Sequence, residues 1–249
     1  MTRPACLFAA LLLATAPLLA QSVPWRPTVM TNNGMVASGH PLASEAGLRV
    51  LQTGGNAVDA ALATWFVQGQ VEPGMTGLGG DMFILVYLAK TGEVKFINGT
   101  GPAPKAATLE FYRSKGEIPS EGPLSVIVPG AVDGALLALS KYGSKPPAEV
   151  MAPAIELAER GFPISDELAG QLRGSRQRLS KYPSTTKVWF RNGEPMKAGE
   201  VLVNRDLAAT LRTIAGRGSE AFYRGPLART SVEYLRANNG IHAEADWAG

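Results

Sequence analysis

The chain has 249 residues, of which 45% are hydrophobic and 18% are charged, and its formal net charge is +3. This composition excludes an intrinsically disordered chain and predicts a substantial buried core. The Lys and Arg residues are scattered among Glu and Asp rather than gathered in runs, so nucleic acid is not an expected partner.

The first twenty residues have the pattern of a secretory signal peptide. Arg3 precedes an apolar stretch from 5 to 19. A membrane anchor needs about 20 apolar residues, whereas this stretch is shorter and is interrupted by Pro17. We therefore expect cleavage of residues 1–20. Residues 21–249 are then expected to form one domain in the periplasm or outside the cell, with no membrane attachment after cleavage.

Residue types that hold metals or form disulfides are scarce. Cys6 is the only cysteine and lies in the expected signal peptide, and the only histidines are His40 and His242. The sequence therefore predicts no disulfide in the mature chain, gives poor support to a zinc site and implies no cofactor. Any chemistry has to use oxygen groups or the backbone.

Two packed helices are predicted after a short strand at 34–38. Residues 41–53 carry apolar or small side chains at helical spacing, and Gly54-Gly55 ends that helix because glycine allows a left-handed turn. Asn56 is placed to cap the second helix. The predicted core stripe of the second helix consists of Val58, Ala61, Leu62, Trp65 and Phe66.

A glycine-rich loop over 72–82 leads into a predicted β-hairpin with strands at 83–88 and 94–98. Residues 77–81 resemble a phosphate-binding loop in composition, but they follow a helix and precede a strand, which is the reverse of the order that such a loop needs. The preferred interpretation is a tight turn, in which Asp81 makes a local hydrogen bond.

The second half is predicted to be largely helical. A β-type run at 124–128 comes first, and the segment 182–203 is expected to be irregular with one turn at Asn192-Gly193. No terminal element is expected in 240–249. The predicted helices are 131–142, 148–160, 165–179, 205–215 and 226–237.

Several motifs together resemble the gamma-glutamyltranspeptidase family. The segments 34–44 and 54–61 are similar to the opening of these proteins, and the resemblance covers nearly all of the chain after the signal peptide. The later motifs are Glu72-Pro73, Gly77 to Asp81, Val128-Pro129-Gly130 and Ala221 to Gly225. Two stretches, Gly80 to Phe83 and Asn98 to Gly101, are closer to a divergent bacterial branch than to the glutathione-hydrolysing branch.

The resemblance implies an α/β (α+β) fold, an incomplete Ntn-hydrolase αββα sandwich with a largely helical second half. Such proteins are made as one precursor that cleaves itself into a large and a small subunit. The new N-terminal threonine of the small subunit is the nucleophile, with its own α-amino group as the base. That threonine would lie beyond the position that matches Gly249. The implied partners are therefore the missing small subunit and a small-molecule amide substrate.

The resemblance also places a candidate substrate-binding segment at Asn98, Gly99 and Thr100. Glutathione-hydrolysing members have an arginine at the position of Thr100, and the fork of donors on arginine suits a substrate carboxylate. No arginine occurs between Arg49 and Arg113 in this sequence. This departure argues against glutathione as the substrate and favours a different acyl group.

Three other candidates have structural interpretations that we favour. Thr185-Thr186 enters a β-type run, as the family's processing site does, but the resemblance places it in an irregular large-subunit segment, so an exposed strand or loop is expected. His40 lies at a strand-to-helix junction, where satisfying polar groups is favoured over acting as a general base. Asp59, in the first turn of its helix, is interpreted as a cap.

The sequence supports two functional hypotheses. The first is a large-subunit fragment of an enzyme that transfers or hydrolyses γ-glutamyl or related acyl amides through a threonine that is not present in this chain, so that the chain alone is inactive and contains no catalytic residue. The alternative is a non-catalytic truncated binding or assembly module, because a sheet without its partner strands leaves apolar edges and faces exposed.

Overall fold

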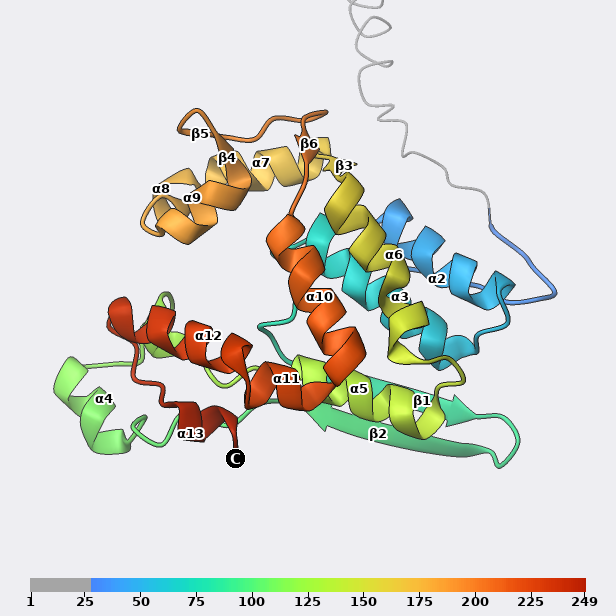
Figure 1. Ribbon diagram of the computed structural model, residues 1–249, viewed down its shortest axis with the longest axis horizontal. Coiled ribbons are helices and arrows are strands. Elements are labelled where there is room, and N and C mark those ends of the chain that lie inside the picture. Colours follow the sequence, from blue (N-terminus) through green and yellow to red (C-terminus); the bar gives the residue numbers. More distant parts are fainter. Residues whose placement is uncertain (1–27) are drawn as a thin grey trace, which may run out of the picture. The chain divides into compact units, whose positions relative to one another are not determined.

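The computed structural model describes residues 28–249 (Figure 1). The expected signal peptide, residues 1–20, lies outside the described residues. Contacts between residues group Met35–Gly249 into one compact unit, which contains all the helices and strands of the described part. In that part of the chain, no helix has the length and apolar character that crossing a membrane requires.

Helix α2 (Pro41–Gln52) begins where the sequence predicted it. The side chain of His40 caps this helix, with Nδ1 accepting a hydrogen bond from the N–H of Leu42 at 3.2 Å, which confirms the structural interpretation of His40. Gly54 follows the helix with φ of +86°, a conformation that favours glycine. The strand predicted at 34–38 is wrong, because the segment pairs with no other strand of the described residues.

Helix α3 (Ala57–Val71) packs against α2 and is buried on most of its surface. The predicted core stripe was partly wrong. One of its members, Ala61, is exposed, and two polar side chains outside it, Asp59 and Gln70, are buried. The Gln70 amide donates a hydrogen bond to the carbonyl of Ala154 at 2.8 Å. Buried polar groups of this kind are tolerated when they are hydrogen-bonded.

The carboxylate of Asp59 ties the start of α3 to the loop that follows α5 (Ala131–Tyr142). It accepts hydrogen bonds from the N–H groups of Asn56 at 2.8 Å, Ser144 at 2.9 Å and Lys145 at 3.1 Å, and from the Ser144 hydroxyl at 2.6 Å. Burial raises the pKa of Asp59, but the hydrogen bonds outweigh it, so that the pKa lies below the ordinary value of 3.8. The predicted cap is confirmed, and it also anchors a second segment.

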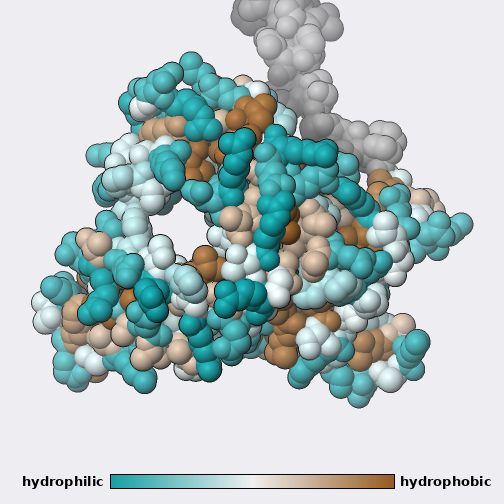
Figure 2. Space-filling model, in the orientation of Figure 1, coloured by the Kyte–Doolittle hydropathy of each residue, from teal (hydrophilic) through white to brown (hydrophobic). Residues whose placement is uncertain are grey.

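Strands β1 (Met82–Leu88) and β2 (Glu93–Gly99) form the predicted antiparallel hairpin. Its two faces differ, because successive side chains of a strand point to opposite sides. The inner face, with Val86 and Ile97 buried, packs against α5. The outer face carries the exposed side chains of Phe83, Leu85, Tyr87, Val94 and Phe96. Figure 2 shows hydrophobic residues over the region of β1 and β2.

The second half is largely helical, as predicted. Helix α6 (Pro147–Arg160) packs against α3 and against α10 (Arg205–Arg217), and side chains from all three belong to one hydrophobic core. The remaining elements are α4 (Leu109–Lys115), η2 (Pro123–Ser125), β3 (Phe162–Pro163), α7 (Asp166–Gly174), α8 (Arg176–Leu179), α9 (Pro183–Trp189), β4 (Phe190–Arg191), β5 (Glu194–Pro195), β6 (Val201–Leu202), α11 (Ser219–Tyr223), α12 (Pro226–Ala237) and α13 (Glu244–Trp247).

The segment 182–203, which we expected to be irregular, contains short ordered elements. Helix α9 begins at Pro183. Proline is suited to this position because the N–H of the first helical residue has no partner within the helix. The turn predicted at Asn192-Gly193 is confirmed, with φ of +52° and +80°, and it joins β4 to β5. Strand β6 pairs with β3 through Leu202 and Phe162. This last pairing joins residues far apart in sequence, which a local pattern does not reveal.

Three other expectations are wrong. Residues 124–128 form no strand, because the Val128 N–H donates to the Pro102 carbonyl at 3.0 Å but Pro102 has no N–H to continue a ladder. The helix predicted over 165–179 divides into α7 and α8 at a glycine-serine pair, and both residues are weak helix formers. The segment 240–249 contains α13, which is held by tertiary contacts.

Candidate functional site

The segment Asn98 to Thr100 lies at the open end of the hairpin, where β2 ends. The Asn98 side-chain oxygen accepts a hydrogen bond from the N–H of Thr100 at 3.0 Å. Asp81, just before β1, accepts one from the N–H of Gly101 at 3.4 Å. The interpretation of Asp81 as a local turn acceptor is therefore wrong, since its partner lies at the end of the other strand.

Close backbone packing fixes the place of Thr100. A Cβ on Gly101 would overlap the carbonyl oxygen of Val128, and a Cβ on Gly130 would overlap the carbonyl oxygen of Gly99. Only glycine fits at both positions, because any side chain would collide with backbone that cannot turn aside. The end of β2 and the start of α5 therefore lie directly against each other.

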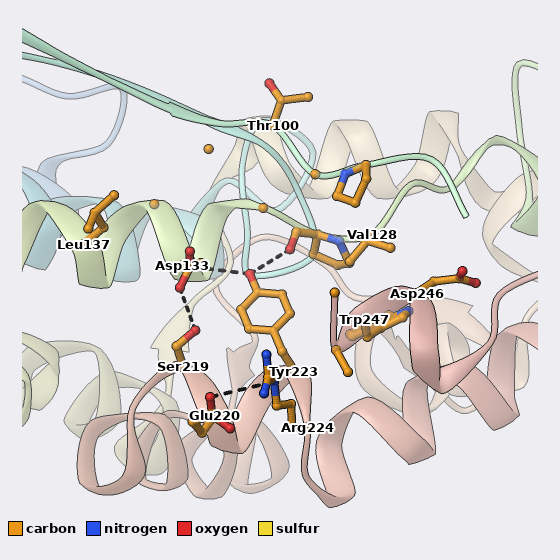
Figure 3. Close-up of a pocket in the computed structure, with 18 of the residues that line it drawn as sticks. Thr100, Val128, Asp133, Leu137, Ser219, Glu220, Tyr223, Arg224, Asp246 and Trp247 are labelled. Atoms are coloured by element: carbon orange, nitrogen blue, oxygen red, sulfur yellow. Dashed lines mark hydrogen bonds and ion pairs between the residues drawn. The ribbon is translucent and has the colours of Figure 1, made fainter. Parts of the chain in front are cut away.

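Thr100 lies on the wall of a pocket of about 320 Å³ (Figure 3). This volume is at the lower end of the range of about 300–1,000 Å³ that is usual for small-ligand sites. Residues from four places line it: the end of β2, the start of α5, α11 with the residue after it, and α13 with the residues after it. The structure thus places Asn98, Gly99 and Thr100 together on one side of a single pocket.

Tyr223, from α11, forms part of the opposite wall and joins it to α5. Its hydroxyl donates to the Pro129 carbonyl at 2.7 Å and accepts from the N–H of Asp133 at 3.2 Å. The Ser219 hydroxyl donates to the Asp133 carboxylate at 2.7 Å. Burial raises the pKa of Tyr223 to about 12, so the phenol stays protonated at neutral pH and remains a hydrogen-bond donor. Figure 3 shows these contacts from Tyr223 and Ser219 to the start of α5.

Charged side chains also line this pocket. Arg224 and Glu220 form a long, solvent-exposed ion pair, with Nε and Oε1 3.7 Å apart. The Asp246 carboxylate accepts hydrogen bonds from the N–H groups of Ala243 at 2.8 Å and Lys105 at 3.1 Å. Burial raises the pKa of Asp246, but these hydrogen bonds and the positive charge of Lys105 oppose it, so that the pKa lies below the ordinary value of 3.8.

A buried histidine holds α13 against the rest of the pocket wall. His242 is 1% exposed, and its Nδ1 accepts a hydrogen bond from the indole N–H of Trp247 at 3.2 Å. Its Nε2 lies 2.9 Å from the carbonyl of Val126, so Nε2 carries the proton and donates. Both ring nitrogens therefore serve the packing of the segment that contains Trp247, and neither faces a ligand.

Two candidates from the sequence lie elsewhere. Thr185 and Thr186 are on helix α9, where the Thr186 hydroxyl donates to the Pro183 carbonyl at 3.0 Å, so the expected strand or loop is wrong. Neither threonine lines the pocket of Thr100. Within residues 28–249, no group of three or more His, Cys, Asp or Glu side chains is arranged to hold a metal ion.

The sequence did not identify the charged residues and the tyrosine that line the rest of the pocket, namely Asp133, Glu220, Tyr223, Arg224 and Asp246. Two of the family motifs contain or adjoin them, since Val128 to Gly130 precedes Asp133 and Ala221 to Gly225 includes Tyr223 and Arg224. Tyr223 and Pro129, which the hydrogen bond joins, are 94 residues apart in the sequence. A single sequence does not show that they meet.

The comparison with known proteins identifies one family. A family model described as gamma-glutamyltranspeptidase matches residues 43–249. The glutathione hydrolase proenzyme of Bacillus subtilis (strain 168) is 39% identical to this chain over 220 residues, which are 86% of the chain and 37% of that protein. The chain therefore spans well under half the length of this relative.

Solved structures give the same answer. The gamma-glutamyltranspeptidase of Helicobacter pylori matches with a TM-score of 0.85 and 37% identity, over 90% of this chain and 65% of that one. The cephalosporin acylase from Bacillus halodurans matches with a TM-score of 0.85 and 36% identity, over 92% of this chain and 44% of that one. These are Ntn-hydrolase folds, so the expected α+β fold class is confirmed. The chain belongs to the gamma-glutamyltranspeptidase family.

Proposed function

We propose that this chain is the large-subunit portion of an enzyme that transfers or hydrolyses γ-glutamyl or related acyl amides. The observation that carries the proposal is the pocket at Asn98 to Thr100, in a chain that matches gamma-glutamyltranspeptidases and acylases along most of its length. In this proposal the nucleophile is a threonine of a small-subunit segment outside this chain. Export to the periplasm or outside the cell, after removal of residues 1–20, is part of the same proposal.

The hairpin supports a small-subunit partner. The outer-face side chains of Phe83, Leu85, Tyr87, Val94 and Phe96 are between 59% and 73% exposed. The rings of Phe83 and Phe96 lie parallel to each other, with centroids 6.3 Å apart, and both belong to this exposed apolar face. Within the described residues, β1 and β2 pair only with each other, which leaves one edge of each strand unpaired. Such a face and such edges suit the packing of further strands.

The acyl group is proposed to differ from that of glutathione. Thr100 can offer a hydroxyl but no positive charge, so it cannot pair with a carboxylate as a guanidinium does. The relatives whose printed names are acylases, including the cephalosporin acylase from Bacillus halodurans, support a wider choice of acyl groups. In this proposal Asn98, Gly99 and Thr100 contact the acyl part of the substrate.

In the proposed reaction, the threonine hydroxyl attacks the amide carbonyl, its α-amino group takes the proton, and the leaving amine departs with a proton. Water or an acceptor amine then releases the acyl group. The described chain contributes the pocket wall. Its role is to orient the acyl group, because correct placement of reacting groups lowers the barrier by removing entropy beforehand.

Release of 4-nitroaniline from γ-glutamyl-4-nitroanilide tests the proposed function. The purified chain alone should release none above background, because the proposal assigns the nucleophile to a segment outside it. Expressed together with its small-subunit segment, the chain should release 4-nitroaniline from this or a related acyl anilide. An inactive assembly with correct subunit cleavage would favour the alternative, a non-catalytic binding or assembly module.

The role of Thr100 has its own test. In the assembled enzyme, Thr100→Arg should lower the KM for γ-glutamyl-4-nitroanilide, because the new guanidinium can pair with the substrate carboxylate. A charge-assisted pair at a partly exposed site contributes about 1 kcal/mol or more, so a fall of about fivefold or more is expected. The matched substrate 4-aminobutyryl-4-nitroanilide has no carboxylate and should keep its KM. An unchanged KM for both substrates would remove Thr100 from the binding site.

A further inference from the structure

Four Asn-Gly pairs occur in the chain, and the structure surrounds them differently. In such a pair the asparagine amide is prone to spontaneous loss of ammonia, because glycine has no Cβ to keep its backbone nitrogen away from the neighbouring side chain. The local structure decides whether the two groups are free to react. All four pairs lie in the described part of the chain: Asn33-Gly34, Asn98-Gly99, Asn192-Gly193 and Asn239-Gly240.

The reaction joins the backbone nitrogen of the glycine to the side-chain carbonyl carbon of the asparagine. A C–N bond forms, the bond to the amide nitrogen breaks, and ammonia leaves with the proton of the glycine N–H. Water then opens the resulting cyclic imide at one of its two carbonyls, which gives either aspartate or isoaspartate. A hydrogen bond to the glycine N–H or to the asparagine amide slows the first step, because that bond has to break before the ring closes.

The pair Asn239-Gly240, which follows α12, is protected at the attacking nitrogen. The N–H of Gly240 donates a hydrogen bond to the carbonyl of Leu235 at 2.7 Å. Asn239 is exposed, so its amide is accessible to solvent but its reaction partner is occupied. Ring closure at this pair therefore requires the end of α12 to loosen first.

The pair Asn98-Gly99, on the wall of the pocket, is protected at both groups. The amide oxygen of Asn98 accepts a hydrogen bond from the N–H of Thr100 at 3.0 Å. Gly99 is buried and lies in β2, opposite Met82 of β1. The backbone rotation that ring closure needs would break the end of the hairpin, so the pocket keeps a neutral amide at Asn98.

The pair Asn192-Gly193 has neither restraint. Both residues are exposed at the turn between β4 and β5. Within residues 28–249, the Asn192 side chain and the Gly193 N–H make no hydrogen bond. The hairpin pairs only two residues of each strand, and so short a hairpin gives its turn little support. The turn can therefore distort at small cost and bring the Gly193 nitrogen onto the Asn192 amide carbon.

We propose that Asn192 is a site of spontaneous deamidation, at which an exposed amide becomes a carboxylate, whereas Asn98 keeps its amide. This inference does not depend on the proposed function. Isoaspartate carries the main chain through its side chain, which lengthens the main chain by one methylene group. The two-residue turn, with φ of +52° at Asn192 and +80° at Gly193, cannot keep the register of β4 and β5 after this insertion. Conversion therefore loosens a hairpin that packs against α7.

Peptide mapping by mass spectrometry tests the inference on the purified chain, kept folded in a mildly alkaline buffer made with oxygen-18 water. The water that opens the ring labels each converted residue. Asn192 is expected to convert at least about fivefold faster than Asn239, because the hydrogen bond to Gly240 contributes about 1 kcal/mol. Asn98 should convert no faster than Asn239. An unconverted Asn192, or conversion of Asn98 or Asn239 as fast as that of Asn192, would overturn the inference.

The same chain unfolded in urea is the reference for the effect of the fold. All four pairs should then convert at similar rates, because the hydrogen bonds and the strand pairing are gone. Asn33-Gly34 should convert in both conditions, since both residues are exposed and the Gly34 N–H makes no hydrogen bond within the described residues. If the order of rates were the same in urea, the neighbouring sequence rather than the fold would set it, and the inference would be rejected.

The matched variant Asn192→Gly tests the effect on the hairpin. It lacks the reactive amide, and glycine suits the positive φ at this position. After the same incubation in the folded state, the wild type should unfold at a lower urea concentration than before, whereas Asn192→Gly should keep its midpoint. Conversion of Asn33 occurs in both and cancels. An equal loss of stability in the two proteins would contradict the proposed loosening of β4 and β5.

Discussion

Replacement of Gly101 by alanine is expected to destabilise the protein by about 3 kcal/mol or more, or to prevent folding, because overpacking against backbone has no cheap relief. The new Cβ would overlap the carbonyl oxygen of Val128. The N–H of Val128 is already bonded to the Pro102 carbonyl at 3.0 Å, so neither of these two segments can shift without the other. Urea unfolding of the purified variant measures the loss.

Gly216→Ala is the matched control for Gly101→Ala. Gly216 lies in α10 and is exposed, and a Cβ added there would meet no atom within 4 Å. Alanine is favoured over glycine inside a helix by about 0.5–1 kcal/mol, so this variant should be slightly more stable than the wild type. Wild-type stability in Gly101→Ala would show that β2 and α5 are not in the close contact described.

The second large loss is expected for Asp59→Asn. The buried carboxylate accepts hydrogen bonds from three backbone N–H groups and one hydroxyl, whereas an amide would turn its own donors toward some of them. A buried donor without an acceptor costs about 1–3 kcal/mol, so a total loss of about 3 kcal/mol in the free energy of unfolding is expected. Chemical denaturation at pH 7 measures it.

Asp206→Asn is the control for this substitution. Asp206 is also in the first turn of a helix, α10, but its side chain is 82% exposed and pairs only with an exposed lysine. The loss there should stay below about 1 kcal/mol, as for other surface pairs and helix-dipole contacts. Similar losses at both positions would mean that Asp59 is not the buried anchor described above.

The contribution of Asp59 to the stability of the fold is expected to depend on pH. Its pKa in the folded protein lies below the ordinary value of 3.8, so the folded state resists protonation more than the unfolded state does. The stabilisation is complete above the unfolded pKa and is lost as the pH falls through it toward the folded pKa. The difference in stability between the wild type and Asp59→Asn should therefore shrink on acidification. A difference that grows as the pH falls would contradict this account.

Much of the helical framework was predictable because its signals are local. The Asn56 cap, the glycines after α2 and the apolar spacing of α5, α6 and α10 each depend on residues within a few turns. The hairpin was predictable for the same reason, since its two strands adjoin each other in sequence. The family motifs also placed Thr100 correctly at the end of the second strand.

The failures share a dependence on distant residues. The run at 124–128 looks like a strand, but its neighbour is a segment with Pro102, which cannot extend a ladder. Strand β6, at the end of 182–203, forms only by pairing with β3, which lies about forty residues earlier in the chain. The side of the pocket that α11 forms depends on the contact of Tyr223 with Pro129, just before α5. Such contacts between distant segments follow from tertiary packing, and a single sequence carries no direct signal for them.

The proposed function requires that the reactive hydroxyl lie outside this chain, and covalent labelling tests that requirement directly. The purified chain, alone, is incubated with a glutamine-like electrophile such as a diazoketone, and its intact mass is measured. The expected result is an unchanged mass, with labelling only when the small-subunit segment is present. A stoichiometric adduct on a threonine of this chain, such as Thr100 or Thr185, would contradict the account.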